Sequence, residues 1–323
     1  MEPAFICAYG VSGVGKTMDA LYSFPEALFI AMPGALKPSR QIFDWEPRRA
    51  IVPGLHELCV LLTQLTPNVV SAVVIDDFSL LVDVTFSDLE KKYTGFHLWG
   101  ALRDYILLVR RLGRQLGIHV LLNAHAIEAR TAKGRFVRGG PKLPGTMSED
   151  FPTACDTVVR AVMGPPRVGY RGQYRATMSD DPNWVAKDRE GRFWDGCPMN
   201  TAELLRSAGY VLPRPVPYRW MDDAVEDLAQ ALEPKLGDPQ LGARLEAVVG
   251  PALAAKCGDV RLAKWVLRDA LDRAIIRNRQ KMSAFSMFGP PAVSLSTLTG
   301  TVDATPSAAA PSTPLGSLLT TPA

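Results

Sequence analysis

The feature that most constrains this chain is an octapeptide close to its N-terminus, Gly10-Val-Ser-Gly-Val-Gly-Lys-Thr17. It matches the pattern GxxxxGK[ST] at every defined position. An apolar run, Phe5–Tyr9, precedes it, and a stretch compatible with a helix follows it as far as about Phe24, before Pro25. Because glycines allow a tight turn between a strand and a helix, the octapeptide predicts a strand–loop–helix unit.

The same residue types are those that a phosphate chain requires. Backbone N–H groups of the glycine-rich turn can surround phosphate oxygens, and the helix that follows adds the positive end of its dipole. Lys16 supplies a positive charge to the β- and γ-phosphates, and the Thr17 hydroxyl can ligate Mg²⁺. We therefore expect ATP and Mg²⁺ as ligands, with a phosphate cradle made of Gly10, Val11, Ser12, Gly13, Val14, Gly15, Lys16 and Thr17.

Beyond the octapeptide, short apolar runs alternate with stretches of helical spacing. The runs that have the length of buried strands are Ala27–Ala31, Ala72–Ile75, Ile118–Leu122 and Asp156–Met163. The stretches with helical spacing are Leu55–Leu65 and Leu98–Leu112. This alternation predicts an α/β fold with a mainly parallel sheet. Two later runs, Gln173–Met178 and Trp184–Lys187, surround a Ser-Asp-Asp-Pro turn and predict a C-terminal β-hairpin.

Composition divides the chain into three parts. Residues 1–213 carry the α/β pattern, and a proline-rich linker at Pro213–Pro217 follows them. Residues 214–282 are helical in pattern, with breaks at Pro234 and Pro251. Residues 283–323 consist mostly of Ser, Thr, Pro, Ala and Gly with almost no charge, which predicts a disordered tail.

The overall composition limits the compartment and the partners that we expect for this chain. Five scattered cysteines without a CxxC pair argue against a disulfide framework or a thiolate zinc site and suit a reducing compartment. No apolar run approaches the ~20 residues that cross a bilayer. The N-terminus lacks the pattern of a secretory signal. We therefore expect a cytoplasmic protein without a membrane partner. Its net charge of +3 confines any nucleic-acid surface to a local patch.

The run Ala72–Ile75 ends in two carboxylates, Asp76 and Asp77. A buried strand that ends in a carboxylate places an oxygen ligand near the magnesium ion, so Asp76 is the expected metal residue. Asp77 either orients or deprotonates the attacking water, or simply caps the next turn.

Taken in order, several motifs resemble RecA-type ATPases, and most closely their phage-encoded, core-only branch of single-strand annealing or AAA-like proteins. They are GVSGVGKT, VVIDDFSLL, WGALRDY, LLNAHAIEAR, GGPKLPG and VAKDREGRF, and they span roughly Phe5 to Pro213. The resemblance implies a RecA-like P-loop core that binds and hydrolyses ATP, forms homo-oligomers, and works with recombination or replication partners in a host cytoplasm.

The resemblance also implies roles for single residues. A polar side chain after the strand Ile118–Leu122, His125 or Asn123, would sense the γ-phosphate; otherwise His125 is a capping residue. Lys187 and Arg189 match a K-x-R-x-G element that reaches the nucleotide of a neighbouring subunit, unless they form a solvated charged hairpin. One departure is clear, because no carboxylate follows the second strand at 29–34, where RecA-type enzymes carry a catalytic glutamate.

A basic stretch, Glu128–Gly145, follows the expected sensor strand. In the RecA fold the corresponding loop faces single-stranded DNA, so cations here would follow phosphates and an aromatic ring would stack on a base. The alternatives are a solvated loop or a subunit contact. The expected nucleic-acid residues are Arg130, Lys133, Arg135, Phe136, Arg138 and Lys142.

Three functions remain compatible with the sequence. The first is a RecA-like ATPase that acts on single-stranded DNA in phage recombination or replication. The second is a nucleotide-dependent scaffold or helicase loader with little hydrolysis, which the missing glutamate favours. The third is a small-molecule kinase, for which the sequence shows no acceptor signature.

Overall fold

A computed structural model describes residues 2–31, 35–36, 46–66, 69–132, 135–145, 147–164, 172–177, 181–189, 191–212, 222–245, 247 and 250–288. The chain divides into two compact units, Met1–Arg219 and Trp220–Ala323, which are considered separately below. Among the described residues, no helix has both the length and the apolar character that a membrane span requires.

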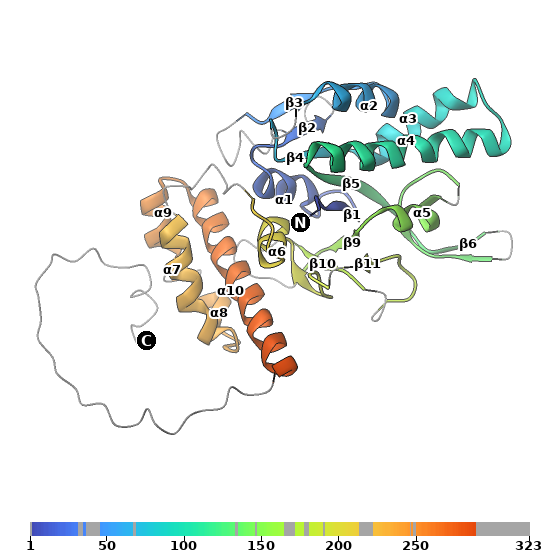
Figure 1. Ribbon diagram of the computed structural model, residues 1–323. Coiled ribbons are helices and arrows are strands. Elements are labelled where there is room, and N and C mark those ends of the chain that lie inside the picture. The colour runs from blue at the N-terminus through green and yellow to red at the C-terminus, as the bar shows by residue number, and fades with distance from the viewer. Residues whose placement is uncertain are drawn as a thin grey trace, which may run out of the picture. The chain divides into compact units, whose positions relative to one another are not determined.

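The first unit alternates strands and helices as the sequence predicts (Figure 1). Its elements are β1 (Phe5–Gly10), α1 (Lys16–Ser23), β2 (Leu28–Ala31), β3 (Arg48–Ala50), α2 (Leu55–Gln64), β4 (Ala72–Asp76), α3 (Phe78–Glu90), α4 (Gly95–Leu116), β5 (His119–Ile127), β6 (Arg130–Ala132), β7 (Arg135–Val137), β8 (Gly140–Pro141), α5 (Met147–Asp150), a 3₁₀ helix (Phe151–Ala154), β9 (Thr157–Val162), β10 (Gln173–Arg175), β11 (Lys187–Asp188), β12 (Cys197–Pro198) and α6 (Thr201–Ser207).

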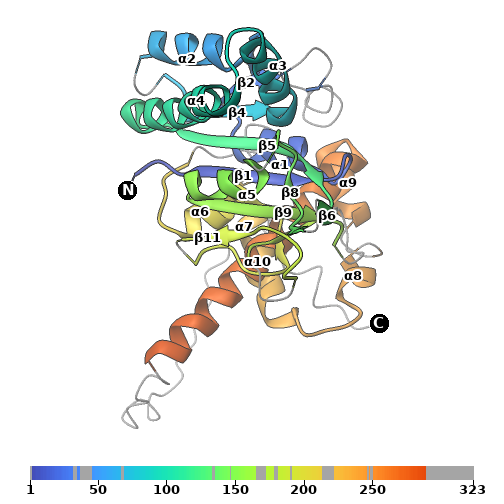
Figure 2. The same ribbon diagram turned by 90° about the vertical axis from the view of Figure 1, so that its right-hand side faces the viewer.

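Ten strands of the described residues form one sheet. Eight of them follow the order β12-β10-β9-β1-β5-β4-β2-β3, while β11 pairs with β9 and β8 pairs with β5 beside this path. Each neighbouring pair along this path from β9 to β3 is parallel. The strand β5 therefore lies between β1 and β4, and Figure 2 shows β5, β1 and β9 side by side. This is the mainly parallel α/β sheet that the alternation of apolar runs and helical stretches predicts.

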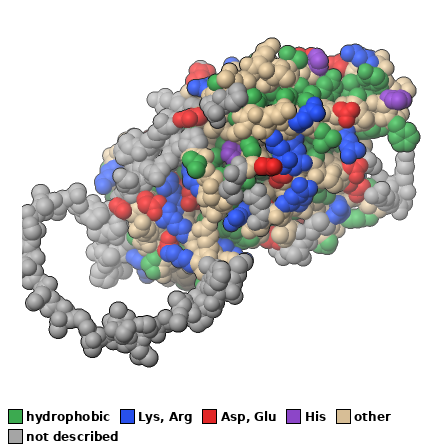
Figure 3. All heavy atoms as spheres, viewed as in Figure 1, with side chains coloured by type: hydrophobic (Ala, Val, Ile, Leu, Met, Phe, Trp, Pro, Cys, Tyr) green, Lys and Arg blue, Asp and Glu red, His purple; other side chains and the backbone are tan. Residues whose placement is uncertain are grey.

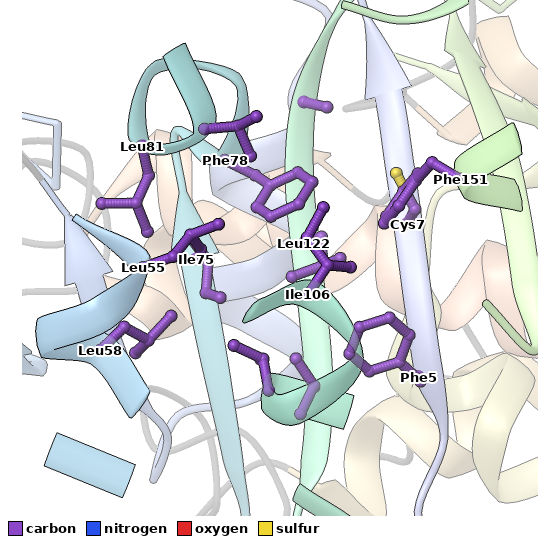
Figure 4. Close-up of a cluster of buried hydrophobic side chains, with 14 of the residues drawn as sticks. Phe5, Cys7, Leu55, Leu58, Ile75, Phe78, Leu81, Ile106, Leu122 and Phe151 are labelled. Atoms are coloured by element: carbon purple, nitrogen blue, oxygen red, sulfur yellow. The ribbon is translucent and has the colours of Figure 1, made fainter. Parts of the chain in front are cut away.

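The central strands are apolar on both faces because helices cover both sides of the sheet. On one side, α2, α3 and α4 lie together over a large apolar cluster (Figures 1 and 2). Figure 4 shows part of this cluster, in which Phe5, Ile75 and Leu122 of three different strands face Phe78 and Ile106. Packing in this cluster holds β1, β4 and β5 in one register, and that register positions the site residues described below.

The expected C-terminal β-hairpin is wrong in its pairing. In the described residues, β10 and β11 do not pair with each other; both run antiparallel along the same edge of β9. β11 takes the positions Thr157 and Val158, and β10 takes Arg160 to Val162. The physical reason is that β9 would otherwise leave an open edge with unpaired backbone groups.

The second unit is helical. Its described elements are α7 (Asp222–Leu232), a 3₁₀ turn (Glu233–Lys235), α8 (Leu241–Arg244), α9 (Gly250–Cys257) and α10 (Val260–Phe288). The long helix α10 packs against α7 and α9. The helix α10 continues past residue 282, where the composition changes, and the remaining tail lies outside the described residues.

Candidate phosphate site and its surroundings

The parallel arrangement brings the C-terminal ends of β1, β4 and β5 to one edge of the sheet. The register sets Gly10 beside His125 and Asp76 beside Asn123. Gly10 is required here for packing, since a Cβ at this position would lie 2.4 Å from the carbonyl oxygen of Ala161. Ligands of open α/β sheets bind at such carboxyl ends.

The turn from β1 to α1 has the backbone that its glycines predict. Gly13 and Gly15 have φ angles of 79° and 107°, which side chains with a Cβ rarely adopt. Gly15 is the residue immediately before α1, so the N-terminal end of the helix opens onto the turn. An anion placed there meets free N–H groups and the positive end of the helix dipole.

Lys16 lies over this turn. Its ammonium group donates hydrogen bonds to the carbonyl oxygens of Gly10 and Val11, each at 2.9 Å. Burial lowers the pKa of Lys16, whereas the carboxylates of Asp76 and Asp77 act to raise it. The cation is thus held over the glycine-rich turn, where the sequence analysis expects the phosphates.

Thr17 and Asp76 meet across the site. The Thr17 hydroxyl donates a hydrogen bond to Asp76 Oδ2 at 2.7 Å. Burial raises the pKa of Asp76, and the hydrogen bond from Thr17 lowers it. A hydroxyl and a carboxylate are the hard oxygen ligands that Mg²⁺ prefers, and Mg²⁺ commonly takes only one or two carboxylates besides the phosphates. The pair therefore fits a magnesium ion shared with a nucleotide.

Asp77 has two partners. Its Oδ1 accepts hydrogen bonds from the backbone N–H groups of Ser79 at 2.7 Å and Leu80 at 3.4 Å, so it caps α3. Its Oδ2 lies 2.7 Å from His125 Nε2. The backbone N–H of His125 in turn donates to Ser79 Oγ at 3.0 Å. Asp77 therefore caps α3, which is one of the two sequence alternatives, and its second oxygen contacts His125; its role toward an attacking water stays a prediction.

Asn123 is the second polar residue of β5 at this edge. Its side chain is buried, and within the described part of the chain neither amide atom has a hydrogen-bond partner of good geometry. Asn123 does lie beside Asp76, close enough for its amide to act to lower the pKa of that carboxyl, so Asp76 is its nearest polar partner and a ligand could complete its remaining hydrogen bonds.

These side chains surround a hollow of about 420 Å³, which lies within the size range of small-molecule sites. Its lining residues include Ser12, Gly13, Gly15, Lys16, Thr17, Asp76, Asp77, Asn123 and His125. The fold thus brings together the cradle, the metal pair and the sensor residues that sequence reasoning placed on separate segments. The arrangement can hold a magnesium–triphosphate group.

Lys187 and Arg189 lie elsewhere in the unit. Lys187 stands opposite Val158 of β9, which is beside Cys7 of β1. Cys7 lies three residues before Gly10, which is about 10 Å along the strand. Lys187 therefore lies at least that far from the phosphate site of its own chain, toward the opposite end of the sheet. The Lys187 ammonium donates to the carbonyl oxygens of Pro152 and Cys155 at 2.9 and 2.8 Å.

Sequence reasoning missed a basic cluster around Asp156. Arg110 and Arg114 of α4 lie 2.6 and 3.5 Å from its carboxylate, and Arg189, with 51% of its side chain exposed, lies 3.7 Å away. Figure 3 shows Lys and Arg side chains gathered on this part of the surface, from α4 toward β11. No local pattern could have revealed the cluster, because its members come from distant segments.

The basic stretch after β5 forms a two-stranded ribbon, β6–β7. Arg130 stands opposite Val137, and Phe136 is 52% exposed. Arg138 is partly buried and Lys142 is exposed. Lys133 and the side chain of Arg135 lie outside the described residues. The ribbon returns through β8, which pairs with Ala126 and Ile127 of β5, directly after His125.

Comparison with known proteins identifies a family. A family described as AAA domain matches residues 2–190, which is more than half of the chain. Among solved structures, a crystal structure of the RadB recombinase is similar at 15% identity, covering 52% of this chain and 78% of that chain. Its TM-score of 0.36 supports no conclusion about this chain. No curated protein matches the sequence.

Proposed function

The chain belongs to the AAA domain family, and from this premise we propose that it is a magnesium-dependent ATPase that acts on single-stranded DNA as an oligomer. Families of this P-loop class usually bind and hydrolyse ATP. The resemblance noted in the sequence suggests phage recombination or replication as the setting.

One observation supports the ATPase proposal above all others: the Thr17 hydroxyl lies 2.7 Å from Asp76, beside the Lys16 cation at the end of a glycine-rich turn. Thr17 and Asp76 would hold magnesium, which neutralises charge on the phosphates when it is bound. Lys16 would bind the β- and γ-phosphates, and Asn123 and His125 would face the terminal phosphate.

The DNA proposal is supported by the position and chemistry of the β6–β7 ribbon. Exposed Arg130 and Lys142 can follow phosphates, and the exposed ring of Phe136 can stack on a base. The strand β5 carries His125 and leads through Ile127 into the ribbon. Loss of the terminal phosphate beside His125 would therefore change the position of the ribbon through a single strand.

The oligomer proposal is supported by the place of Arg189. It lies toward the opposite end of the sheet from the phosphate site of its own chain, so any nucleotide on which it acts belongs to another copy. A fixed guanidinium near a γ-phosphate stabilises the charge that develops during transfer. The Asp156 cluster holds Arg189 and two further arginines in place for that role.

The first test measures phosphate release from ATP, with and without single-stranded DNA, alongside the mass of the assembly. We expect hydrolysis that requires Mg²⁺ and rises with DNA, together with a multimeric mass in the presence of nucleotide. Lys16→Ala should abolish ATP binding. Wild-type protein without magnesium-dependent affinity for ATP would contradict the whole proposal.

A second test concerns the ribbon. Phe136→Ala and Arg130→Ala should each weaken single-strand binding, and Arg130→Ala alone should also lower the salt dependence, by about 0.7 in the slope of log K against log [salt] for one lost phosphate contact. Arg103→Ala, at an exposed position of α4, is the matched control. Unchanged affinity in both ribbon variants would place the DNA site elsewhere.

A second candidate function has one observation in its favour. Between Glu26 and Asp44 the sequence contains no acidic residue, so the segment after β2 cannot supply the glutamate of RecA-type enzymes. The candidate is a scaffold or helicase loader that changes state on ATP binding. Tight ATP binding with turnover too slow to respond to DNA would favour it over the ATPase.

A further inference from the structure

Asp77, Ser79 and His125 form a closed polar unit beside the phosphate site. Asp77 Oδ1 binds the backbone of Ser79 at 2.7 Å, Ser79 Oγ accepts from the backbone of His125 at 3.0 Å, and His125 Nε2 returns to Asp77 Oδ2 at 2.7 Å. Ser79 is buried, so this unit fastens the end of β5 to the first turn of α3. The imidazole therefore has a fixed orientation.

The hydrogen bonds assign the ring protons. A carboxylate only accepts hydrogen bonds, so Nε2 of His125 must carry the hydrogen that points to Asp77. In a neutral imidazole the other nitrogen then has a free lone pair. Within the described part of the chain Nδ1 has no hydrogen-bond partner, and the side chain is 45% exposed where it lines the hollow.

We propose that His125 Nδ1 accepts a hydrogen bond from the attacking water, and that Asp77 is the positioning residue that fixes this tautomer. The inference rests on the proposed ATPase function. The water oxygen forms a bond to the γ-phosphorus, and the bond from that phosphorus to the oxygen of ADP breaks and leaves its electron pair on ADP. Both water hydrogens end on the phosphate product, so the ring undergoes no net change.

This assignment accounts for the absent glutamate. Asp77 Oδ1 is already engaged with two backbone N–H groups of α3, and Oδ2 with the imidazole. Asp77 therefore acts through His125 rather than directly on the water. The ring of His125 instead offers the hollow an acceptor nitrogen that is not engaged with α3.

The variant Asp77→Asn separates the two roles of Asp77, which are to cap α3 and to orient the ring of His125. Asparagine caps helices about as well as aspartate, so α3 keeps its first turn. Its NH₂ group donates to Nε2, which moves the ring hydrogen to Nδ1 and removes the acceptor for water. We expect kcat to fall about 100-fold with little change in the Kd for ATP. Asp88→Asn, the same change at an exposed site of α3, is the control.

Variants of the ring itself test the same idea. Glutamine offers an amide oxygen as an acceptor, so His125→Gln should retain more turnover than His125→Ala, while both bind ATP like the wild-type protein. Because glutamine can also keep the hydrogen bond to Asp77, equal free energies of unfolding for the two variants are required to separate this order from a structural role. Equal kcat for His125→Ala and the wild-type protein would overturn the proposal.

The tautomer can also be observed without turnover. The ¹⁵N NMR signals of the His125 ring, identified by their loss in His125→Gln, should show hydrogen on Nε2 in the wild-type protein and on Nδ1 in Asp77→Asn. A wild-type ring with hydrogen on Nδ1 overturns the assignment. A protein that binds ATP without hydrolysing it overturns the ATPase function, and the role of water with it. Normal hydrolysis with unchanged kcat in Asp77→Asn and His125→Ala overturns only the inference made here.

Discussion

At the scale of single residues, Asp156 shows how one buried carboxylate can organise several cations. Arg110 and Arg114 reach it from α4, and Arg189 reaches it from the turn after β11. The backbone N–H of Phe5 also donates to it, at 3.1 Å, which ties it to the start of β1. Glu2 also pairs with Arg114, at 3.1 Å, so three arginines meet two carboxylates and the described cluster keeps a positive surplus that an incoming phosphate group could neutralise.

The prediction at this scale concerns Arg189. Arg189→Ala should leave the Kd for ATP unchanged and remove most turnover, because an arginine supplied to another copy's γ-phosphate contributes about 10³-fold or more to kcat. Arg192→Ala, at an exposed position in the same segment, should behave like the wild-type protein.

Mixing variants shows whether Arg189 acts between copies. Lys16→Ala lacks a working cradle but keeps Arg189, and Arg189→Ala has the reverse defect. If one site is built from two copies, a mixture of the two inactive proteins should recover part of the wild-type turnover. A mixture as inactive as its components would argue that Arg189 supports its own subunit only.

At the scale of elements, the base of the β6–β7 ribbon is clamped between two strands. On one side β8 pairs with the end of β5, and on the other Gly139 exchanges backbone hydrogen bonds of 2.8 Å with Asn183 and Val185. The segment at Trp184 and Val185 leads directly into β11. The ribbon therefore contacts both the strand that carries His125 and the strand that leads to Arg189.

Gly139→Ala tests this clamp. A Cβ at this position would lie 2.6 Å from Trp184 Cε3 and 2.9 Å from the Ile127 carbonyl oxygen, so the ribbon must shift. We expect a loss of about 1–3 kcal/mol in the free energy of unfolding. We also expect hydrolysis that no longer rises with single-stranded DNA, although turnover without DNA persists. Gly100→Ala on α4, where a Cβ meets nothing within 4 Å, is the control.

Local chemistry made part of this arrangement predictable. The glycine-rich turn and the place of Asp76 at the end of β4 each depend on a few consecutive residues, and the buried strands on short apolar runs, so the sequence alone predicted these positions. The pairing of β10 and β11 with β9, and the ring of Asp77, Ser79 and His125, depend on register between distant segments. No spacing within one element encodes such register, and these features became visible only in the folded chain.

At the scale of the whole molecule, the second unit has its own source of stability. Its helices α7 and α10 are joined by ion pairs from Glu226 to Arg273 and Arg277, of which the Arg277 pair is bidentate. Lys281 pairs with Glu233 one turn further along α10. Such bidentate pairs fix helix geometry more firmly than single contacts do.

Glu226→Gln tests what this pairing contributes. The hydrogen bonds from Arg277 lower the pKa of Glu226 from 4.5 to about 2. A carboxyl whose pKa is lower in the folded state stabilises the fold fully above its unfolded pKa and loses that contribution as the pH falls through the folded pKa. The side chain is about one-third exposed, so solvent screening limits the expected loss at pH 7 to about 1 kcal/mol. Thermal unfolding should show this difference between variant and wild type at pH 7, shrinking as the pH falls from 4.5 toward 2. A difference that stayed constant over that range would mean that Glu226 contributes through packing rather than charge.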